Sequence, residues 1–276
     1  MNGPQAAAAT ASVPGDETAR LYLLLTEVFR AGLAATLAGV VFAGIGARVV
    51  MRISAAINAD AAGAVTENGN VVGEITFGGT LELLLFNGLL LGLLMGTIWV
   101  VVREWLPAQV ALRVSLAALL AALVGGSAVV DAGNIDFLIV EPAWLHIVMF
   151  VALVAGAGAL TAGIDLALEG RLPTGEPAAP ILGGLAGLGL MVGGPLLVVY
   201  YFVPGGAQNG TSPWPAGIAF AGVAVATLVG WARYYREGGG LAGPRPTRER
   251  ALGYGGLLLF GLFGGIHLAA EINSLV

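Results

Sequence analysis

Stretches of about 20 residues without a charged side chain recur along this chain, and each is long enough to cross the hydrocarbon core of a bilayer as a helix. Charged residues make up 11% of the 276 residues, against about 25% in an ordinary soluble domain. With 57% hydrophobic residues and a mean hydropathy of +0.88, the chain is neither a soluble globular domain nor a disordered one. We therefore predict an all-α integral membrane protein.

The hydropathy pattern divides the chain into a short tail and one membrane domain. Residues 1–19 are rich in Ala, Pro and Gly and are expected to form a disordered tail, followed by a single polytopic domain over residues 20–276. Leu21–Arg30, which Glu27 and Arg30 interrupt with charge, is expected to lie at the membrane interface. About seven spans follow. We place them at Ala31–Met51, Thr80–Val102, Val110–Val130, Ala143–Leu168, Ile181–Phe202, Ala216–Tyr235 and Ala251–Glu271.

The distribution of arginine predicts the orientation of these helices. Arg103 and Arg113 bracket the second loop and several arginines fill the sixth, whereas the loops 131–142 and 204–215 contain none. Because positively charged loops stay in the cytoplasm, we expect the N-terminus inside and the C-terminus outside. The outer end of the first span breaks this pattern, because Arg48 and Arg52 lie there. Either the first span is placed wrongly, or these two arginines have a specific reason to be there, such as acidic partners.

Residues 63–79 connect the first two spans and contain Asn68-Gly69 between Val-rich segments. This dipeptide favours a tight hairpin turn. We therefore expect a short extracytoplasmic β-hairpin there.

Glycine is abundant, with 44 residues, and many glycines are spaced four apart. Gly88, Gly92 and Gly96 form one such stripe, and Gly261 and Gly265 form another. Small residues at this spacing let helix backbones approach closely in lipid. We expect them to pack helices within the chain, or to form the face of a homo-oligomer or of a complex with a partner membrane subunit. The lipid bilayer is the expected environment, and no nucleic-acid partner is expected.

Ionisable residues near the outer ends of the spans form the candidate ligand-binding site, because burying such groups costs free energy. The predicted ligand-binding residues are Arg48, Arg52, Glu82, Asp131, Asp136 and Glu141. Arginine suits an anionic solute and the carboxylates suit a cation. Ion pairing that only locks the helix ends is the alternative interpretation.

Two histidines at similar depth raise a second possibility. His146 and His267, with Glu271, would suit a divalent metal or a single b-type haem. No cofactor motif occurs, so no resident cofactor is predicted. At the inner end, Asp165 and Glu169 share a helix face, and we expect a solvated helix end there.

Several kinds of chemistry are excluded by composition. The chain has no Cys, and all 12 basic residues are Arg, which removes thiol nucleophiles, Cys-ligated metals and lysine-based catalysis. Neither HExxH nor GxSxG occurs. We therefore expect no enzymatic activity.

Five short stretches resemble those of uncharacterised multi-pass inner-membrane proteins from high-GC bacteria. They are Met51-Arg52-Ile53-Ser54, Glu67-Asn68-Gly69, Gly73-Glu74-Ile75-Thr76, Gly78-Gly79-Thr80-Leu81 and Asn134-Ile135-Asp136-Phe137. The resemblance covers part of the N-terminal half, implies a bacterial cytoplasmic membrane and implies no activity.

The sequence thus favours a non-enzymatic membrane protein that binds or transports a small solute or ion through an outward-facing polar site. The alternatives are an accessory membrane subunit without chemistry of its own and a haem- or metal-binding membrane protein.

Overall fold

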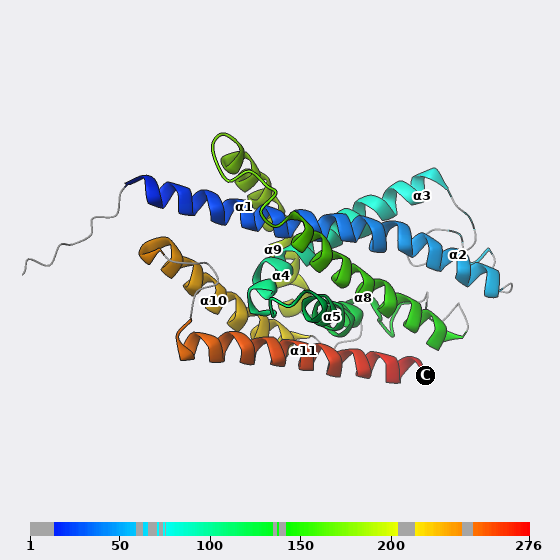
Figure 1. The fold of residues 1–276 in the computed structure, drawn as a ribbon. Coiled ribbons are helices and arrows are strands. Elements are labelled where there is room, and N and C mark those ends of the chain that lie inside the picture. Colours follow the sequence, from blue (N-terminus) through cyan, green and yellow to red (C-terminus); the bar gives the residue numbers. More distant parts are fainter. Residues whose placement is uncertain are drawn as a thin grey trace, which may run out of the picture.

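The computed structural model describes residues 14–58, 63–65, 71, 74, 76–134, 137, 142–203, 213–238 and 245–276. Seven helical runs in this part of the chain are long and apolar enough to cross a membrane, so the chain is a multi-pass membrane protein. Figure 1 shows the runs gathered in one bundle, with the C-terminus at the end opposite the turn between α10 and α11.

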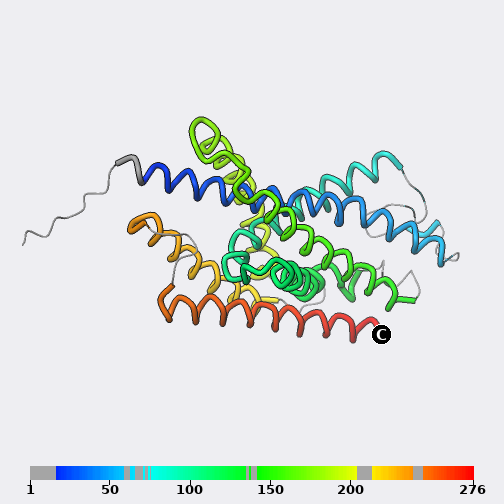
Figure 2. The backbone as a smooth tube through the Cα atoms, viewed as in Figure 1, coloured from blue at the N-terminus to red at the C-terminus, as the bar shows by residue number. Residues whose placement is uncertain are grey.

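Three of the seven runs contain a π-helical segment. The first is α1 (Pro14–Gly39), η1 (Val40–Gly46) and α2 (Ala47–Ile57); the second is α3 (Phe77–Glu82), η3 (Leu83–Leu90), α4 (Leu91–Val102) and the 3-10 turn η4 (Arg103–Trp105); the third is α5 (Val110–Leu120), η5 (Ala121–Gly125) and α6 (Gly126–Val129). The other four are α8 (Ala143–Leu168), α9 (Ala178–Phe202), α10 (Trp214–Glu237) and α11 (Thr247–Leu275). The tube in Figure 2 follows the same path from α1 to the C-terminus.

Small residues bring the first two runs into backbone contact. A Cβ atom on Gly92 would lie 2.8 Å from the Cα of Thr36, and one on Gly96 would lie 3.1 Å from the Cα of Gly32. A larger side chain at Gly92 would push α1 and α4 apart, so the glycine stripe fixes this helix pair. α10 and α11 form a second close pair on the other side of the bundle.

The core between these pairs is aromatic. Phe260 on α11 is 1% exposed, and its ring centre lies 5.3 Å from that of Phe220 on α10 and 6.3 Å from that of Tyr201 on α9. Tilted and edge-on ring pairs at these distances add to the stabilisation that close packing gives. This cluster joins α9, α10 and α11 to the rest of the bundle.

The bundle has two polar ends. We call the end that holds Glu27, Arg30, Arg103 and Asp165 the arginine end, and the end that holds Arg48, Glu82, His146 and Glu271 the histidine end. At 1.5 Å per residue, the helix between Arg30 and Arg48 is about 27 Å long and that between Glu82 and Arg103 about 32 Å long. Both lengths match the hydrocarbon core of about 30 Å, so the two ends lie at its two boundaries.

The structure departs from the sequence-based expectations at three places. Between α2 and α3, the described residues form one isolated antiparallel bridge, from Val65 to Val71, and no paired strands, so the β-hairpin is not supported. Helix α1 begins at Pro14, inside the segment predicted as a tail. The first helical run ends at Ile57, beyond the predicted end of the first span at Met51.

Candidate functional site

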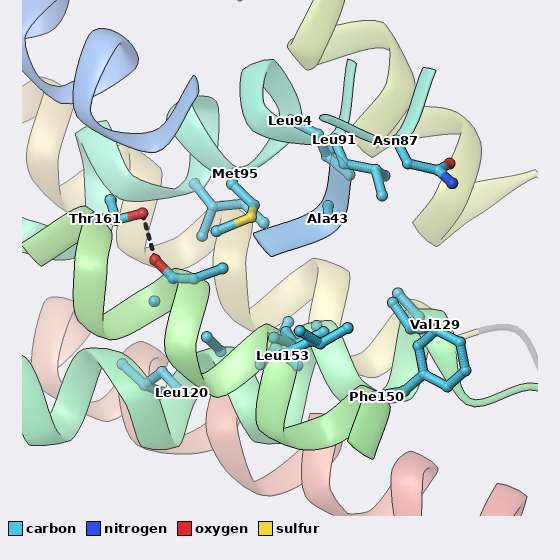
Figure 3. A pocket seen from close by; sticks show the side chains of 18 of the residues that line it. Ala43, Asn87, Leu91, Leu94, Met95, Leu120, Val129, Phe150, Leu153 and Thr161 are labelled. Carbon is cyan, nitrogen blue, oxygen red and sulfur yellow. Dashed lines mark hydrogen bonds between the residues drawn. The ribbon is translucent and has the colours of Figure 1, made fainter. Parts of the chain in front are cut away.

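A cavity of about 370 Å³ lies inside the bundle, among the first five spans and α11. Its volume falls within the range of about 300–1,000 Å³ that small-molecule sites occupy. Figure 3 shows Asn87, Val129 and Phe150 toward one end of the cavity, and Thr161 and Leu120 toward the other. The cavity therefore extends along the bundle between its two polar ends.

Small side chains on facing helices leave this space open. The cavity wall includes Ala43, Ala47, Ala117, Ala121, Gly125, Ala128, Ala157 and Gly158. Close-packed interiors contain few voids larger than a water molecule, so a cavity of this size is not an ordinary packing defect.

All three π-helical segments contribute to the cavity wall: η1 through Ala43, η3 through Asn87 and η5 through Gly125. A π-turn inserts an extra residue into a helix and changes the direction of the side chains that follow. Such segments are frequently found at functional sites. Their convergence on one cavity points to a binding site.

None of the described residues that line the cavity carries a charge. Two of the polar side chains use their protons on backbone carbonyls: Thr161 Oγ1 donates to Ala157 O at 2.8 Å, and the Tyr200 hydroxyl donates to Ser127 O at 3.3 Å. The Asn87 amide makes no hydrogen bond within the described part of the chain. The cavity wall is thus mainly apolar and includes the side-chain amides of Asn87 and Asn134, of which Asn87 lies toward the histidine end.

The cavity stops about one helical turn short of a buried charge network at the arginine end. Thr161, which lines the cavity, precedes Asp165 by four residues on α8, and Trp99 precedes Arg103 by four residues. Residues four apart lie one above the other on a helix face. The network therefore lies next to the cavity wall at this end.

Two carboxylates and two guanidinium groups make up this network, which joins α1, η4 and α8. Asp165 Oδ1 accepts from Arg30 Nε at 2.9 Å and from Arg103 Nη1 at 2.8 Å. Glu27 Oε2 lies 2.8 Å from Arg30 Nη2 and accepts from Arg103 Nη2 at 2.9 Å. Asp165 is 0% exposed and Arg103 is 2% exposed, so the expected solvated helix end at Asp165 is wrong.

A second charge network lies beside the first and joins η4, α10 and α11. Arg245 Nη2 donates to Glu104 Oε2 at 2.7 Å, and Arg245 Nε lies 3.3 Å from Glu249 Oε1, which belongs to a carboxylate that also pairs with Arg233. The Arg245 guanidinium lies 4.4 Å from the ring centre of Trp105. Arg103 and Glu104 are consecutive, so η4 connects both networks.

The predicted ligand-binding residues do not form a comparable network in the described part of the chain. Arg48 is half-buried, and its Nε and Nη2 atoms have no hydrogen-bond partner among the described residues. Arg52 and Glu82 are exposed. Asp131 is half-buried and accepts from Gly133 N at 2.8 Å. Two further predicted residues, Asp136 and Glu141, lie outside the described residues. Ligand binding by this set stays a prediction.

The two histidines make separate contacts. His146 is 3% exposed; its Nε2 lies 2.6 Å from Ser54 Oγ and its Nδ1 lies 3.3 Å from Pro142 O. His267 Nε2 lies 3.8 Å from Glu271 Oε1, and Glu271 Oε2 accepts from Ala132 N. Within the described part of the chain, no group of three or more His, Asp or Glu side chains is arranged to hold a metal ion.

The glycine faces considered for partner binding contact helices of the same chain. Gly88, Gly92 and Gly96 pack against the first span, and Gly261 and Gly265 contact Leu120 and Leu123 on the third. A surface already covered by one helix is not free for another. An association with a second subunit stays a prediction and would use a different surface.

The signals for the buried network were present in the sequence. Asp165 interrupts an apolar stretch, and Glu27 and Arg30 are spaced to share a helix face. The pairing of these acids with the arginines depends on how α1, η4 and α8 pack, which is a property of the tertiary structure. The cavity has no sequence signal, because Ala and Gly are frequent in helix contacts throughout the chain.

No protein family model, curated protein or solved structure matches this chain. The function is therefore argued from the geometry of the chain itself.

Proposed function

We propose that this protein binds a small solute in the cavity between its membrane helices, catalyses no reaction, and exchanges the solute at the histidine end. The observation that carries the proposal is the 370 Å³ cavity, whose wall combines small side chains with all three π-helical segments. The proposed site lies deeper among the helices than the outward-facing polar site that the sequence favours.

The ion pairs that hold the arginine end together support solute exchange at the histidine end. The charges at the arginine end are paired across three helices and are largely buried, whereas His146 at the histidine end forms a hydrogen bond with the hydroxyl of Ser54, a group without a formal charge. Separating buried ion pairs leaves uncompensated charges and is costly. Opening of the bundle therefore requires less free energy at the histidine end.

The membrane and the orientation belong to the same proposal. Exposed arginines cluster at the arginine end, including Arg171, Arg236, Arg248 and Arg250. Arginine near the ends of spans keeps a loop on the cytoplasmic side. We place the arginine end in the cytoplasm of a bacterial cell and the histidine end outside.

The test is to fill the cavity and to measure binding of one probe, 1-decanol, to the purified protein by native mass spectrometry. We expect wild type to bind one decanol per chain and Ala157→Phe to bind none, because Ala157 is 2% exposed and lines the cavity. Ala269→Phe makes the same change at an exposed position on α11 and should bind as wild type does.

Helix content and monodispersity must be the same in all variants, and Ala43→Leu provides a milder filling if Ala157→Phe misfolds. Equal decanol binding by wild type and a folded cavity-filled variant would overturn the proposal. Stoichiometric co-purification of another membrane protein, without decanol binding, would favour the role of an accessory subunit.

A further inference from the structure

We infer that the cavity takes an uncharged, mainly apolar molecule whose single hydrogen-bonding head group pairs with the side-chain amide of Asn87. This inference rests on the proposed function and names the class of solute.

The cavity wall does not suit a charged solute. Every described residue of the cavity wall is uncharged, and the nearest buried carboxylates at the arginine end already neutralise two guanidinium groups. An ion placed in such a cavity would lose its hydration without gaining a counter-charge, which costs several kcal/mol. A carboxylate, a phosphate or an ammonium group therefore does not fit.

Asn87 is the polar side chain of the cavity wall that is available to a solute, because Asn134 and Tyr201, which also line the cavity, already have contacts within the chain. Asn87 lies in the middle of η3 and lines the cavity, and Figure 3 shows its amide at the end near Val129 and Phe150. The hydroxyls of Thr161 and Tyr200 already donate to backbone carbonyls. Trp99 Nε1 is buried away from the cavity surface and is not available either.

The side-chain amide of Asn87 determines which head groups of the solute fit. A side-chain amide presents both a donor and an acceptor, so it complements a hydroxyl, a carbonyl or another amide. A polar side chain without a partner inside a membrane bundle is costly, which makes a binding role the default reading. The head group thus points toward the histidine end, from which the proposed function has the solute enter.

The apolar part of the cavity wall determines the body of the solute. The wall beyond Asn87 is formed by long apolar side chains such as Leu91, Leu94, Met95 and Leu153. These groups offer dispersion contacts and no hydrogen bonds, so the body of the solute is aliphatic or aromatic.

The experiment compares three probes that share a ten-carbon chain and differ in the head group: 1-decanol, decanoate and decylammonium. Binding to the purified protein is measured by native mass spectrometry and by the rise in melting temperature. We expect decanol to bind at least about tenfold more tightly than either ion.

Asn87 is tested with the same probes. Asn87→Leu should weaken decanol binding about tenfold, which corresponds to the loss of one hydrogen bond. Asn87→Asp should shift the preference toward decylammonium. Asn273→Leu, the same change at an exposed position on α11, should leave all three affinities unchanged.

The outcomes separate the two proposals. Equal binding of the three probes, or unchanged decanol binding to Asn87→Leu, would overturn the assignment of the solute class while leaving the cavity as a binding site. If none of the probes binds, or if Ala157→Phe binds all of them as wild type does, the proposed function itself fails.

Discussion

The two ends of the helix bundle hold their polar groups in different ways. At the arginine end, Asp165 and Glu27 each contact the same two guanidinium groups, and the residues come from three helices. At the histidine end, His146 contacts the Ser54 hydroxyl and the Pro142 carbonyl, and Glu271 contacts the Ala132 amide and His267. Both ends lie at a boundary of the membrane core, so their environment does not explain the difference.

The difference shows which end can separate. A buried carboxylate that bridges two arginines cannot lose one partner without leaving a charge in a medium of low polarity. A neutral hydrogen bond contributes only about 0.5–1.5 kcal/mol, because water replaces it when the helices part. The arginine end is therefore expected to stay closed while the histidine end opens.

The largest effect is expected for Asp165→Asn, which leaves Arg30 and Arg103 with one carboxylate between them. We expect the free energy of unfolding to fall by about 3–5 kcal/mol, as measured by equilibrium unfolding in mixed detergent micelles. Glu169→Gln removes the same charge from an exposed position directly after α8 and should change the free energy of unfolding by less than about 0.5 kcal/mol. Equal losses for the two variants would show that the network does not hold the arginine end together.

Glu249→Gln tests the second network at the same end. Glu249 accepts from Arg233 and lies against Arg245, and its side chain is 5% exposed. Charge-assisted hydrogen bonds are worth more than neutral ones, so we expect a loss of about 1.5–3 kcal/mol in the same unfolding measurement. The matched control is Glu237→Gln on the exposed surface of α10, for which no resolvable loss is expected.

Ser54→Ala probes the main contact of the histidine end. The variant removes the hydroxyl that His146 Nε2 contacts at 2.6 Å and leaves a buried ring nitrogen without that partner. We expect the free energy of unfolding to fall by about 1 kcal/mol. Ser274→Ala, at an exposed position of α11, should leave the free energy of unfolding unchanged. A loss as large as that of Asp165→Asn would mean that the histidine end is held as firmly as the other.

The smallest effect is expected for Arg48→Met. Because two buried nitrogens of Arg48 have no partner among the described residues, replacing the side chain with an apolar one of similar length should leave the stability unchanged within about 0.5 kcal/mol or raise it. Arg103→Met makes the identical change at the arginine end and should cost about 3–5 kcal/mol. Equal changes in the free energy of unfolding for the two variants would show that arginine is held equally firmly at both ends.

Much of the architecture was predictable because hydropathy is local. The apolar stretch from Ala143 to Leu168 was placed at the bounds of α8, and all seven expected spans correspond to a helical run that is long enough to cross a membrane. The candidate site was less predictable. The sequence directed attention to Arg48 and Arg52, whereas the structure places a buried network at Asp165 and a cavity beside Asn87.

The sequence by itself determined that the chain crosses a membrane about seven times, because a run of apolar residues can satisfy its backbone in lipid only as a helix. It also predicted that helix backbones approach closely at Gly92, although only the structure shows that the neighbour there is α1. Only the tertiary structure decided which charges are neutralised and where space remains. Those properties arise between helices that are distant in sequence, as Arg30, Arg103 and Asp165 are, and no local pattern records which helices become neighbours.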